Sequence, residues 1–508
     1  MFNRSSGVLM HVSSLPGEFG IGSFGRHARQ FINLLKESGC KYWQTLPFGP
    51  TDSFNSPYAS ISAFAGNYNF IDLEQLKDEG LLTEQELVDE KYANPYTAAF
   101  EFLNIRRVPV LYKAYGRIRE AYKAIIKEFE AENKHWLPDY ALYTILKEAN
   151  MGREWYDWED SGLRLHDPEA VRAAGEQYAD TIEFMEFIQY VFFKQWAEIK
   201  EYANSRGIEI IGDLPMYVAL NSSDVWANRE VFDLNRDGKP KCVAGVPPDY
   251  FSELGQKWGN PLYNWDAMRA GGYSWWIERL RSSFALFDTV RIDHFRAFSA
   301  YWAVPAEAET AKEGQWLKGP GMDFFNSVKE IFGEGKIIAE DLGLIDEGVT
   351  KLIEDTGFPC MRVMQFGFLD DYNNLHLPHN YPKNSAAYTG THDNNTVLGW
   401  LWEASPEARK RALDYCSFRG ADWAEGGFRS ASCRAMITAL WQSPANMAIV
   451  PIQDLCGFGK DTKMNVPGVP NGNWAFRISE DQMNSIDIEW LKKLNKTYYR
   501  FNETAANG

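Results

Sequence analysis

Eight short apolar runs recur along the chain, each rich in β-forming residues and each ending in polar, glycine or proline residues. Patterns typical of helices lie between several of them. Nearly continuous apolar strands that alternate with helices predict a parallel sheet with both faces covered. Eight such units predict an α/β fold, the (β/α)8 barrel or TIM barrel. The runs begin at Gly7, Cys40, Ile208, Phe287, Lys336, Met361, Ser385 and Met447.

Two of the intervening helices are expected from the spacing of their apolar residues. In the helix after the first run, Ser23 is the expected N-cap and Gly39 the expected stop. The other helix is expected over 273–287, directly before the fourth run. The apolar faces consist of Phe24, Ala28, Phe31 and Leu35 in the first helix, and of Trp276, Leu280 and Phe284 in the second.

The runs are unevenly spaced along the 508 residues. Two long gaps lie between the second and third runs and between the third and fourth. We expect one catalytic barrel over 1–508, with a largely helical insertion at approximately 51–180 and a loop-rich, substrate-covering insertion at approximately 221–272. Insertions in βα loops rise over the active-site face of a barrel, so they should shape a substrate groove.

The net charge of −17 makes nucleic acid or an anionic membrane an improbable partner, because both require a basic surface. A neutral partner is compatible with this charge. Aromatic residues make up 15% of the chain, which suits sugar rings but also suits ordinary core packing. Composition therefore excludes partners without selecting one.

The six cysteines lie far apart and form no C-x-x-C pair, which predicts neither a zinc site nor a disulfide framework. No apolar run is long enough to span a bilayer, and the first residues lack the apolar core of a secretion signal. These features predict a cytoplasmic protein, or a plastid protein if the chain is a mature plant or algal one.

Four expected strands end in a carboxylate, and strand C-terminal ends in a barrel converge on one mouth. In the fourth run, Arg291 and Asp293 are two residues apart and point to the same side of the strand, with His294 at its exit. A guanidinium favours the ionised carboxylate that a nucleophile needs. A purely structural ion pair is an equally good interpretation of this segment alone.

The other three strand ends each have a functional and a structural interpretation. Glu340 is a possible proton donor, and the side chain of the adjacent Asp341 must diverge from it. His392 and Asp393 could line the mouth, although Asp393 and the two asparagines after it could equally cap the next helix. Asp213 is either a turn residue or a ligand contact.

Taken together, converging carboxylates favour retaining glycoside chemistry. One carboxyl group attacks the anomeric carbon, and a second protonates the departing oxygen. A third could hold the hydroxyls of a distorted sugar ring.

No metal is expected, although one segment begins like a calcium loop with Asp233, Asn235, Asp237 and Gly238. Its twelfth position is Ala244, where a bidentate glutamate belongs. A polar turn is the better interpretation.

The chain resembles, nearly end to end, the amylomaltases, which are 4-α-glucanotransferases of the α-amylase clan. The R-x-D, strand-end Glu and H-D motifs are shared across that clan, whereas the PPDYFS…WGNPLY loop is typical of amylomaltases. Ala297 and Gly367 depart from the usual family residues, glycine and alanine respectively. The matching segments are SLPGEFGIG, SPY, SAFAGN, GDLPMYVA, AGVPPDYFSELGQKWGNPLY, VRIDHFRAF, IIAEDLG, LPHNYP, TGTHDNNT and NVPGVPNGNW.

The resemblance implies that Asp293 is the nucleophile, Glu340 the general acid/base and Asp393 the stabiliser that distorts the sugar. The implied donors and acceptors are α-1,4-glucans, with no cofactor. The implied substrate-binding residues are Tyr58, Asp213, Trp258, Arg291, His294, His392 and Asn465.

Two other functions remain open at this stage. An α-glucan hydrolase would use the same three carboxylates, and an inert glucan-binding protein could keep the groove without turnover. The oligomeric state is not predicted.

Overall fold

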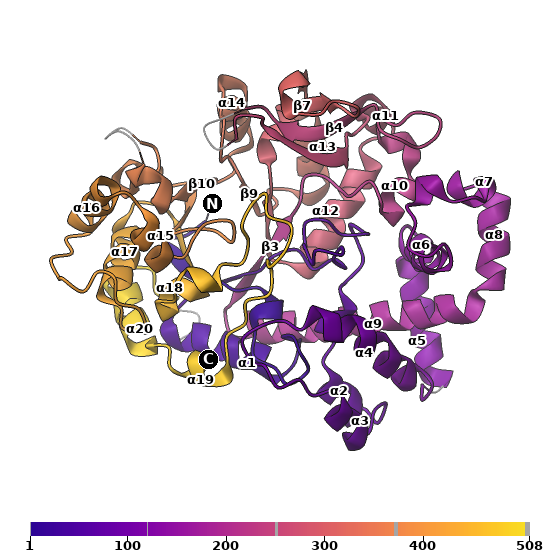
Figure 1. Ribbon diagram of the computed structural model, residues 1–508, viewed down its shortest axis with the longest axis horizontal. Coiled ribbons are helices and arrows are strands. Elements are labelled where there is room, and N and C mark those ends of the chain that lie inside the picture. Colours follow the sequence, from indigo (N-terminus) through magenta and orange to yellow (C-terminus); the bar gives the residue numbers. More distant parts are fainter. Residues whose placement is uncertain (1, 119, 249–251, 370–373, 503–508) are drawn as a thin grey trace.

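The computed structural model of the chain describes residues 2–118, 120–248, 252–369 and 374–502 (Figure 1). Its centre is a closed barrel of parallel strands in the order β1-β12-β11-β10-β9-β6-β3-β2. Each strand overlaps one of the eight apolar runs, and β1 and β10 begin two residues and one residue before the predicted starts, so the predicted barrel is confirmed. The strands are β1 (Ser5–Leu9), β2 (Tyr42–Gln44), β3 (Glu209–Leu214), β6 (Thr289–Ile292), β9 (Ile337–Ala339), β10 (Cys360–Val363), β11 (Ser385–Tyr388) and β12 (Met447–Pro451).

Helix α1 (Arg26–Ser38) follows the first strand and ends, as predicted, at Gly39, which takes a left-handed conformation with φ 74°. The predicted N-cap is wrong: Gly25 occupies that position. The Ser23 hydroxyl instead donates a hydrogen bond of 2.7 Å to Asp72, a partner that is distant in sequence. The second predicted helix is α12 (Ser274–Leu286).

Most of the helices between β2 and β3 gather to one side of the barrel, at the right and bottom of Figure 1. The last and longest of them, α9, contacts β3 and α12 and so covers the barrel wall. The division of the chain into a barrel and inserted subdomains remains a prediction. These helices are α2 (Leu73–Asp78), α3 (Glu84–Asp89), α4 (Phe100–Tyr115), α5 (Glu120–Glu132), α6 (Leu137–Ala149), α7 (Ser161–Arg164), α8 (Pro168–Gln177) and α9 (Ala179–Asn204).

A small antiparallel sheet lies beyond the barrel, at the top of Figure 1, in the order β5-β4-β7-β8. Its strands are β4 (Cys242–Val246), β5 (Gln256–Pro261), β7 (Ala300–Pro305) and β8 (Gln315–Lys318). Strands β4 and β5 lie within the segment 221–272, whose role as a substrate-covering insertion remains a prediction. Strand β4 pairs with β7, which belongs to the loop after β6, and such a distant partner leaves no local pattern.

The remaining helices lie in the loops and crossovers after β3. They are α10 (Ser223–Ala227), α11 (Trp265–Ala270), α13 (Met322–Phe332), α14 (Glu347–Thr356), α15 (Val397–Glu403), α16 (Pro406–Tyr415), α17 (Ala431–Gln442), α18 (Ile452–Cys456), α19 (Glu480–Asn484) and α20 (Ile488–Thr497).

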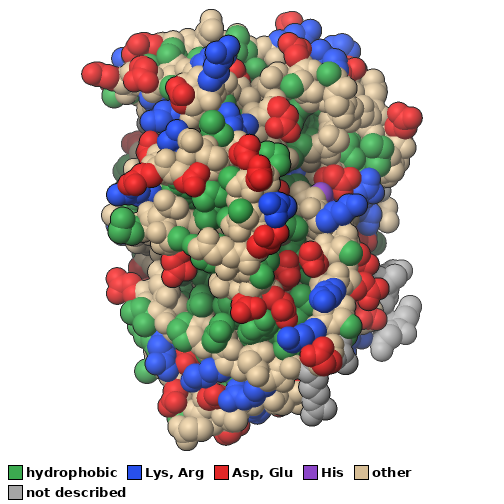
Figure 2. Space-filling view, turned by 90° about the vertical axis from the view of Figure 1, so that its right-hand side faces the viewer, with side chains coloured by type: hydrophobic (Ala, Val, Ile, Leu, Met, Phe, Trp, Pro, Cys, Tyr) green, Lys and Arg blue, Asp and Glu red, His purple; other side chains and the backbone are tan. Residues whose placement is uncertain are grey.

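The face of the molecule drawn in Figure 2 carries acidic and basic side chains interspersed among hydrophobic ones, without a continuous basic surface. Within the described ranges, no helix combines the length and the apolar character needed to cross a membrane.

Candidate active site

Arg291 joins two carboxylates at the end of β6. The strand register places it beside Asp213 of β3. One guanidinium nitrogen, Nη1, lies 2.6 and 2.8 Å from the two Asp213 oxygens, while Nη2 lies 3.0 Å from Asp293. The Asp213 side chain is fully buried, whereas that of Asp293 is 31% exposed at the barrel mouth. The structural ion pair is therefore Arg291 with Asp213, and Asp293 remains open to a ligand.

Two opposing effects act on the pKa of Asp293. Burial raises the pKa of this carboxyl group, and the nearby Arg291 opposes the rise. The guanidinium is the group that favours an ionised Asp293 in this setting.

Glu340 follows β9 and points away from its neighbour Asp341, as predicted. Asp341 accepts hydrogen bonds from the Met361 backbone N–H and the Arg362 side chain. The Glu340 carboxylate accepts backbone N–H bonds of 2.7 Å each from His294 and Leu342.

Burial is the largest influence on the pKa of Glu340. With Arg291 opposing the rise and the charge of Asp293 adding to it, the pKa reaches about 7. A carboxyl group in this range holds a proton near neutral pH and can donate it.

Asp393 follows β11 and is held from two sides. The Asn465 side chain donates a 2.7 Å hydrogen bond to one oxygen, and the His392 ring lies 3.2 Å from the other. The surrounding protein raises the pKa of Asp393, but these two contacts outweigh that effect and leave it at about 2. Asp393 therefore stays ionised across the ordinary pH range.

The alternative interpretation, that this segment caps the next helix, is wrong. Thr396 is the N-cap of α15, and its hydroxyl accepts from Gly399 N–H. The Asn394 side chain instead accepts from the backbone and hydroxyl of Thr391, which orders the loop itself.

An aromatic cluster forms one wall of the site. The Tyr58 ring stacks on the His392 ring, with the ring centroids 5.1 Å apart. The Tyr58 hydroxyl donates a hydrogen bond of 2.7 Å to Asp213. Trp474 contacts both rings, at 5.7 Å from Tyr58 and 6.0 Å from His392. Sequence reasoning did not select Trp474, because it follows no strand and only its membership of the NVPGVPNGNW segment marks it.

A second aromatic group surrounds His294, the residue after Asp293. The Trp258 ring meets the His294 ring edge to face at 4.9 Å, and Tyr217 lies 6.3 Å from Trp258. Burial lowers the pKa of His294 to about 3, so this imidazole is neutral. Sequence reasoning does not select Tyr217 either. Asp249, Tyr250 and Phe251 of the PPDYFS motif lie outside the described residues.

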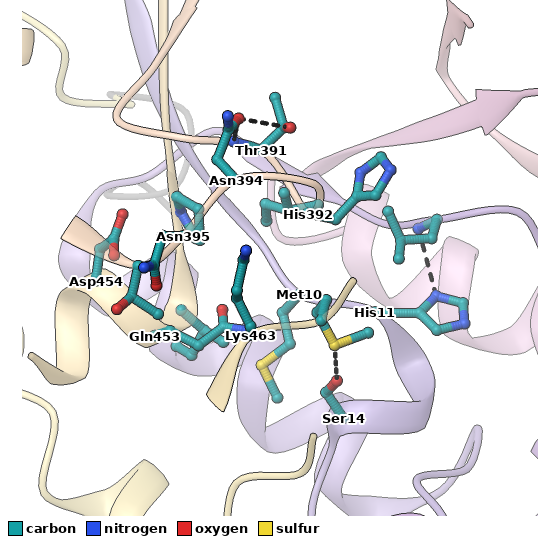
Figure 3. A pocket seen from close by; sticks show the side chains of 16 residues that line it. Met10, His11, Ser14, Thr391, His392, Asn394, Asn395, Gln453, Asp454 and Lys463 are labelled. Atoms are coloured by element: carbon teal, nitrogen blue, oxygen red, sulfur yellow. Dashed lines mark hydrogen bonds between the residues drawn. The ribbon is translucent and has the colours of Figure 1, made fainter. Parts of the chain in front are cut away.

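A small pocket lies beside the loop that carries His392, between β1, β11 and β12 (Figure 3). Its volume is about 20 Å³, room for a water molecule rather than a sugar. His11 lines it, and burial followed by the nearby His392 lowers the pKa of His11 to about 3. Asp454 lies on the side of the pocket opposite His11, and in the view of Figure 3 Lys463 lies between them.

The suspected calcium loop is a polar turn. The Asn235 side chain accepts the backbone N–H groups of Asp237 and Lys239, and Gly238 has φ 82°. Among the residues that the structure describes, no group of three or more His, Cys, Asp or Glu is arranged to hold a metal ion.

A closed parallel barrel whose mouth gathers an arginine, an ionised aspartate and a protonatable glutamate defines the class of barrel enzymes that act on glycosidic bonds. A protein-family model described as 4-alpha-glucanotransferase matches residues 10–483. The chain belongs to the 4-alpha-glucanotransferase family.

Relatives and a solved structure agree over nearly the whole chain. The 4-alpha-glucanotransferase of Streptococcus pneumoniae is 44% identical, covering 100% of this chain and 99% of that protein. The enzyme of the same name from Thermus thermophilus is 43% identical over 94% of this chain and 95% of that protein. A structure of the amylomaltase from Streptococcus agalactiae in complex with acarbose superposes with a TM-score of 0.94 at 38% identity, covering 98% of this chain and 100% of that one.

Proposed function

We propose that this 4-alpha-glucanotransferase transfers α-1,4-glucan segments by a retaining double displacement, with Asp293 as nucleophile, Glu340 as general acid/base and Asp393 as stabiliser. The observation that carries the proposal is the contrast between two carboxyl groups at one mouth. Asp293 lies 3.0 Å from Arg291, while the pKa of Glu340 is raised to about 7. Burial raises the pKa of both carboxyl groups, but Asp293 has a guanidinium in direct contact that stabilises its anion, whereas Glu340 holds a proton near neutral pH.

In the first step, the Asp293 carboxylate attacks the anomeric carbon of the donor. The glycosidic C–O bond breaks, and Glu340 gives its proton to the departing oxygen. In the second step, the 4-hydroxyl of an acceptor glucan or of glucose attacks the same carbon. Glu340 takes the proton from that hydroxyl, the bond to Asp293 breaks, and the α configuration is restored.

The remaining polar groups fit a sugar bound between the two aromatic walls. Asp393 is 45% exposed and accepts hydrogen bonds readily, so it can hold ring hydroxyls that shift in the transition state. The proposed sugar contacts are Tyr58, Trp258, His294, His392 and Asn465. Asp213 and Arg291 complete the proposed substrate-binding set: the Asp213 side chain is fully buried, and Arg291 reaches the site through its 3.0 Å contact with Asp293.

Transfer rather than hydrolysis requires that an acceptor sugar outcompete water. Trp258 is 38% exposed beside His294 and offers a flat face where an acceptor ring can lie. Maltooligosaccharides, starch or glycogen are the proposed donors.

Incubation with maltotriose tests this function. We expect glucose and a ladder of longer chains at a nearly constant number of reducing ends, whereas steadily rising reducing ends would indicate a hydrolase. Asp293→Asn should lower turnover by about a thousandfold or more. Asp266→Asn is the matched control, because that side chain is 96% exposed. Unchanged turnover in Asp293→Asn would contradict the mechanism.

Azide separates the roles of the two carboxyl groups. With an α-maltosyl fluoride donor, whose leaving group needs no proton, Glu340→Ala should still form the intermediate on Asp293. Azide should then release it as the α-azide, with retained configuration. A β-azide from this variant would show that Glu340 is not the acid/base.

We infer a cytoplasmic location, or a plastid location for a plant or algal chain. All six cysteines are unpaired, which suits a reducing compartment. Fractionation of the source cells checks this, and recovery in an oxidising compartment would contradict it.

A further inference from the structure

One buried carboxylate holds both ends of the segment 389–397, which carries His392 and Asp393. The Thr389 hydroxyl donates a hydrogen bond of 2.6 Å to one oxygen of Asp454, and the Val397 backbone N–H donates one of 2.7 Å to the other. Thr389 and Val397 are fully buried and Asp454 is 2% exposed. The loop thus leaves β11 and enters α15 at two points fixed to a single side chain.

The same short helix, α18, also anchors the segment that reaches Asp393 from the other side. The Gln453 side chain of this helix donates a hydrogen bond of 3.1 Å to the Thr462 carbonyl. A few residues later, Asn465 donates through its backbone to the His392 carbonyl and through its side chain to Asp393. Figure 3 shows Asp454 and Gln453 on one side of the small pocket and His392 on the other.

We propose that Asp454 is a positioning residue for the His392–Asp393 pair, acting through Thr389 and Val397, with Gln453 supporting the opposite segment. The inference rests on the proposed role of Asp393 at the reacting sugar. Asp393 is the most exposed of the three carboxylates placed in the mechanism, so its position depends on how its loop is held. Displacements of about 1 Å are sufficient to slow an enzyme a hundredfold.

A role in stability alone accounts poorly for a carboxylate at this position. Burial raises the pKa of Asp454 to about 6, and only its bonds with Thr389 and Val397 oppose that rise. The thiols of Cys433 and Cys456, whose own pKa values are raised, also interact with its charge, and Lys463, His11 and His392 line the same pocket. Burying this carboxylate costs desolvation free energy. It supplies two hydrogen-bond acceptors at a fixed separation, one for Thr389 and one for Val397.

Three variants separate the proposal from a general loss of structure. Asp454→Ala removes both bonds and should lower kcat for maltotriose disproportionation at least about tenfold, with a smaller change in KM. Asp454→Asn should keep most of the activity, because its oxygen can accept from Val397 N–H while its amide donates to the Thr389 oxygen. Thr389→Val removes one bond at nearly constant volume and should fall between the two.

Asp288→Ala is the matched control. Asp288 accepts hydrogen bonds from Ile210 N–H and the Asn204 side chain at the opposite end of the barrel. A similar loss of stability is expected there, with kcat unchanged. An equal kcat in the alanine variants at 454 and 288 would overturn the proposal, and so would an Asp454→Asn variant as slow as Asp454→Ala.

The titration of His392, followed by NMR of labelled histidine, gives a readout independent of turnover. Contact with Asp393 raises the pKa of His392 against the lowering effect of burial. In Asp454→Ala this pKa should fall as the pair separates, whereas an unchanged titration would contradict the positioning role. If the unmodified protein makes no maltooligosaccharide ladder, the proposed function fails, but this titration still decides whether Asp454 holds the pair.

Discussion

The His294 backbone N–H donates a hydrogen bond of 2.7 Å to the Glu340 side chain. His294 directly follows Asp293 and adopts a left-handed backbone conformation with φ 49°. Such a conformation is strained for a non-glycine residue and tends to occur at functional sites. This turn therefore links the strand of the proposed nucleophile directly to the proposed acid.

The pH dependence of kcat/KM should be bell-shaped. Glu340 can donate a proton only while protonated, so activity should fall as the pH rises through about 7. Asp293 attacks only when ionised, and burial raises its pKa, so the acid limb should lie above the ordinary carboxyl range of about 4. Asp393, with a pKa of about 2, should add no limb in between. Initial rates with maltotriose across pH check this.

A glycosyl fluoride donor provides the control for that profile. Its leaving group needs no proton, so the alkaline limb of the glycosylation step should disappear. If the limb persists unchanged with this donor, a group other than Glu340 controls it.

Substitutions at Tyr58 should separate its ring from its hydroxyl. Tyr58→Phe keeps the stack on His392 but loses the bond to Asp213, which should lower the free energy of unfolding by about 1–2 kcal/mol and affect turnover little. Tyr58→Ala also removes the stack and should lower kcat/KM at least about tenfold. Equal kinetic losses in the two variants would indicate that the hydroxyl, not the ring, is what the sugar requires.

Asn465→Asp should lower kcat/KM, and the size of the loss should depend on pH. The new carboxyl group would face Asp393 at the position of a 2.7 Å hydrogen bond, and two like charges there repel. The loss in kcat/KM should shrink as the pH falls, because the new group takes up a proton. Asn465→Ala loses only the hydrogen bond, so its deficit should not vary with pH. Parallel pH profiles for the two variants would contradict this account.

The barrel strands and the four carboxylate ends could be predicted because both depend on local patterns. Strand and helix periodicity reports burial within a few residues, and a barrel brings every strand end to one mouth. Glu340 and Asp341 illustrate this, since adjacent strand residues must diverge, and they do.

What could not be predicted depends on partners distant in the chain. Asp213 could not be assigned from its own segment, because its role comes from the register that brings Arg291 of β6 beside it. Ser23 does not cap helix α1, because its hydroxyl donates its hydrogen bond to Asp72 instead. Trp474 reaches the site on a loop after the last barrel strand, where periodicity carries no information.

Gly367→Ala should destabilise this chain, although alanine is the residue expected there from the family resemblance. A Cβ at Gly367 would lie 2.6 Å from the His376 carbonyl oxygen and 3.0 Å from the Leu377 nitrogen. Backbone atoms cannot give way as side-chain ends can, so we expect a loss of about 1–3 kcal/mol in the free energy of unfolding, measured by urea denaturation.

Gly175→Ala is the control for that measurement. Gly175 lies inside helix α8, and a Cβ there would meet nothing within 4 Å. The free energy of unfolding of this variant should rise by about 0.5–1 kcal/mol. A neutral or stabilising Gly367→Ala would mean that the segment around His376 moves away at little cost.

Trp258→Ala should shift the enzyme from transfer toward hydrolysis. The indole is half-exposed, and its edge-to-face contact with His294 places it next to the proposed covalent intermediate. Its removal should admit water and weaken acceptor binding together, so a larger share of intermediates should end as free reducing ends. The ratio of reducing ends formed to glucose released from maltotriose measures this share.

Two further variants serve as controls. In Trp258→Phe this ratio should lie nearer that of the unmodified protein. Trp402→Ala is the control, since Trp402 is 41% exposed on α15 and its indole N–H bonds the Ala424 carbonyl. An unchanged ratio in Trp258→Ala would show that water is excluded by other parts of the mouth.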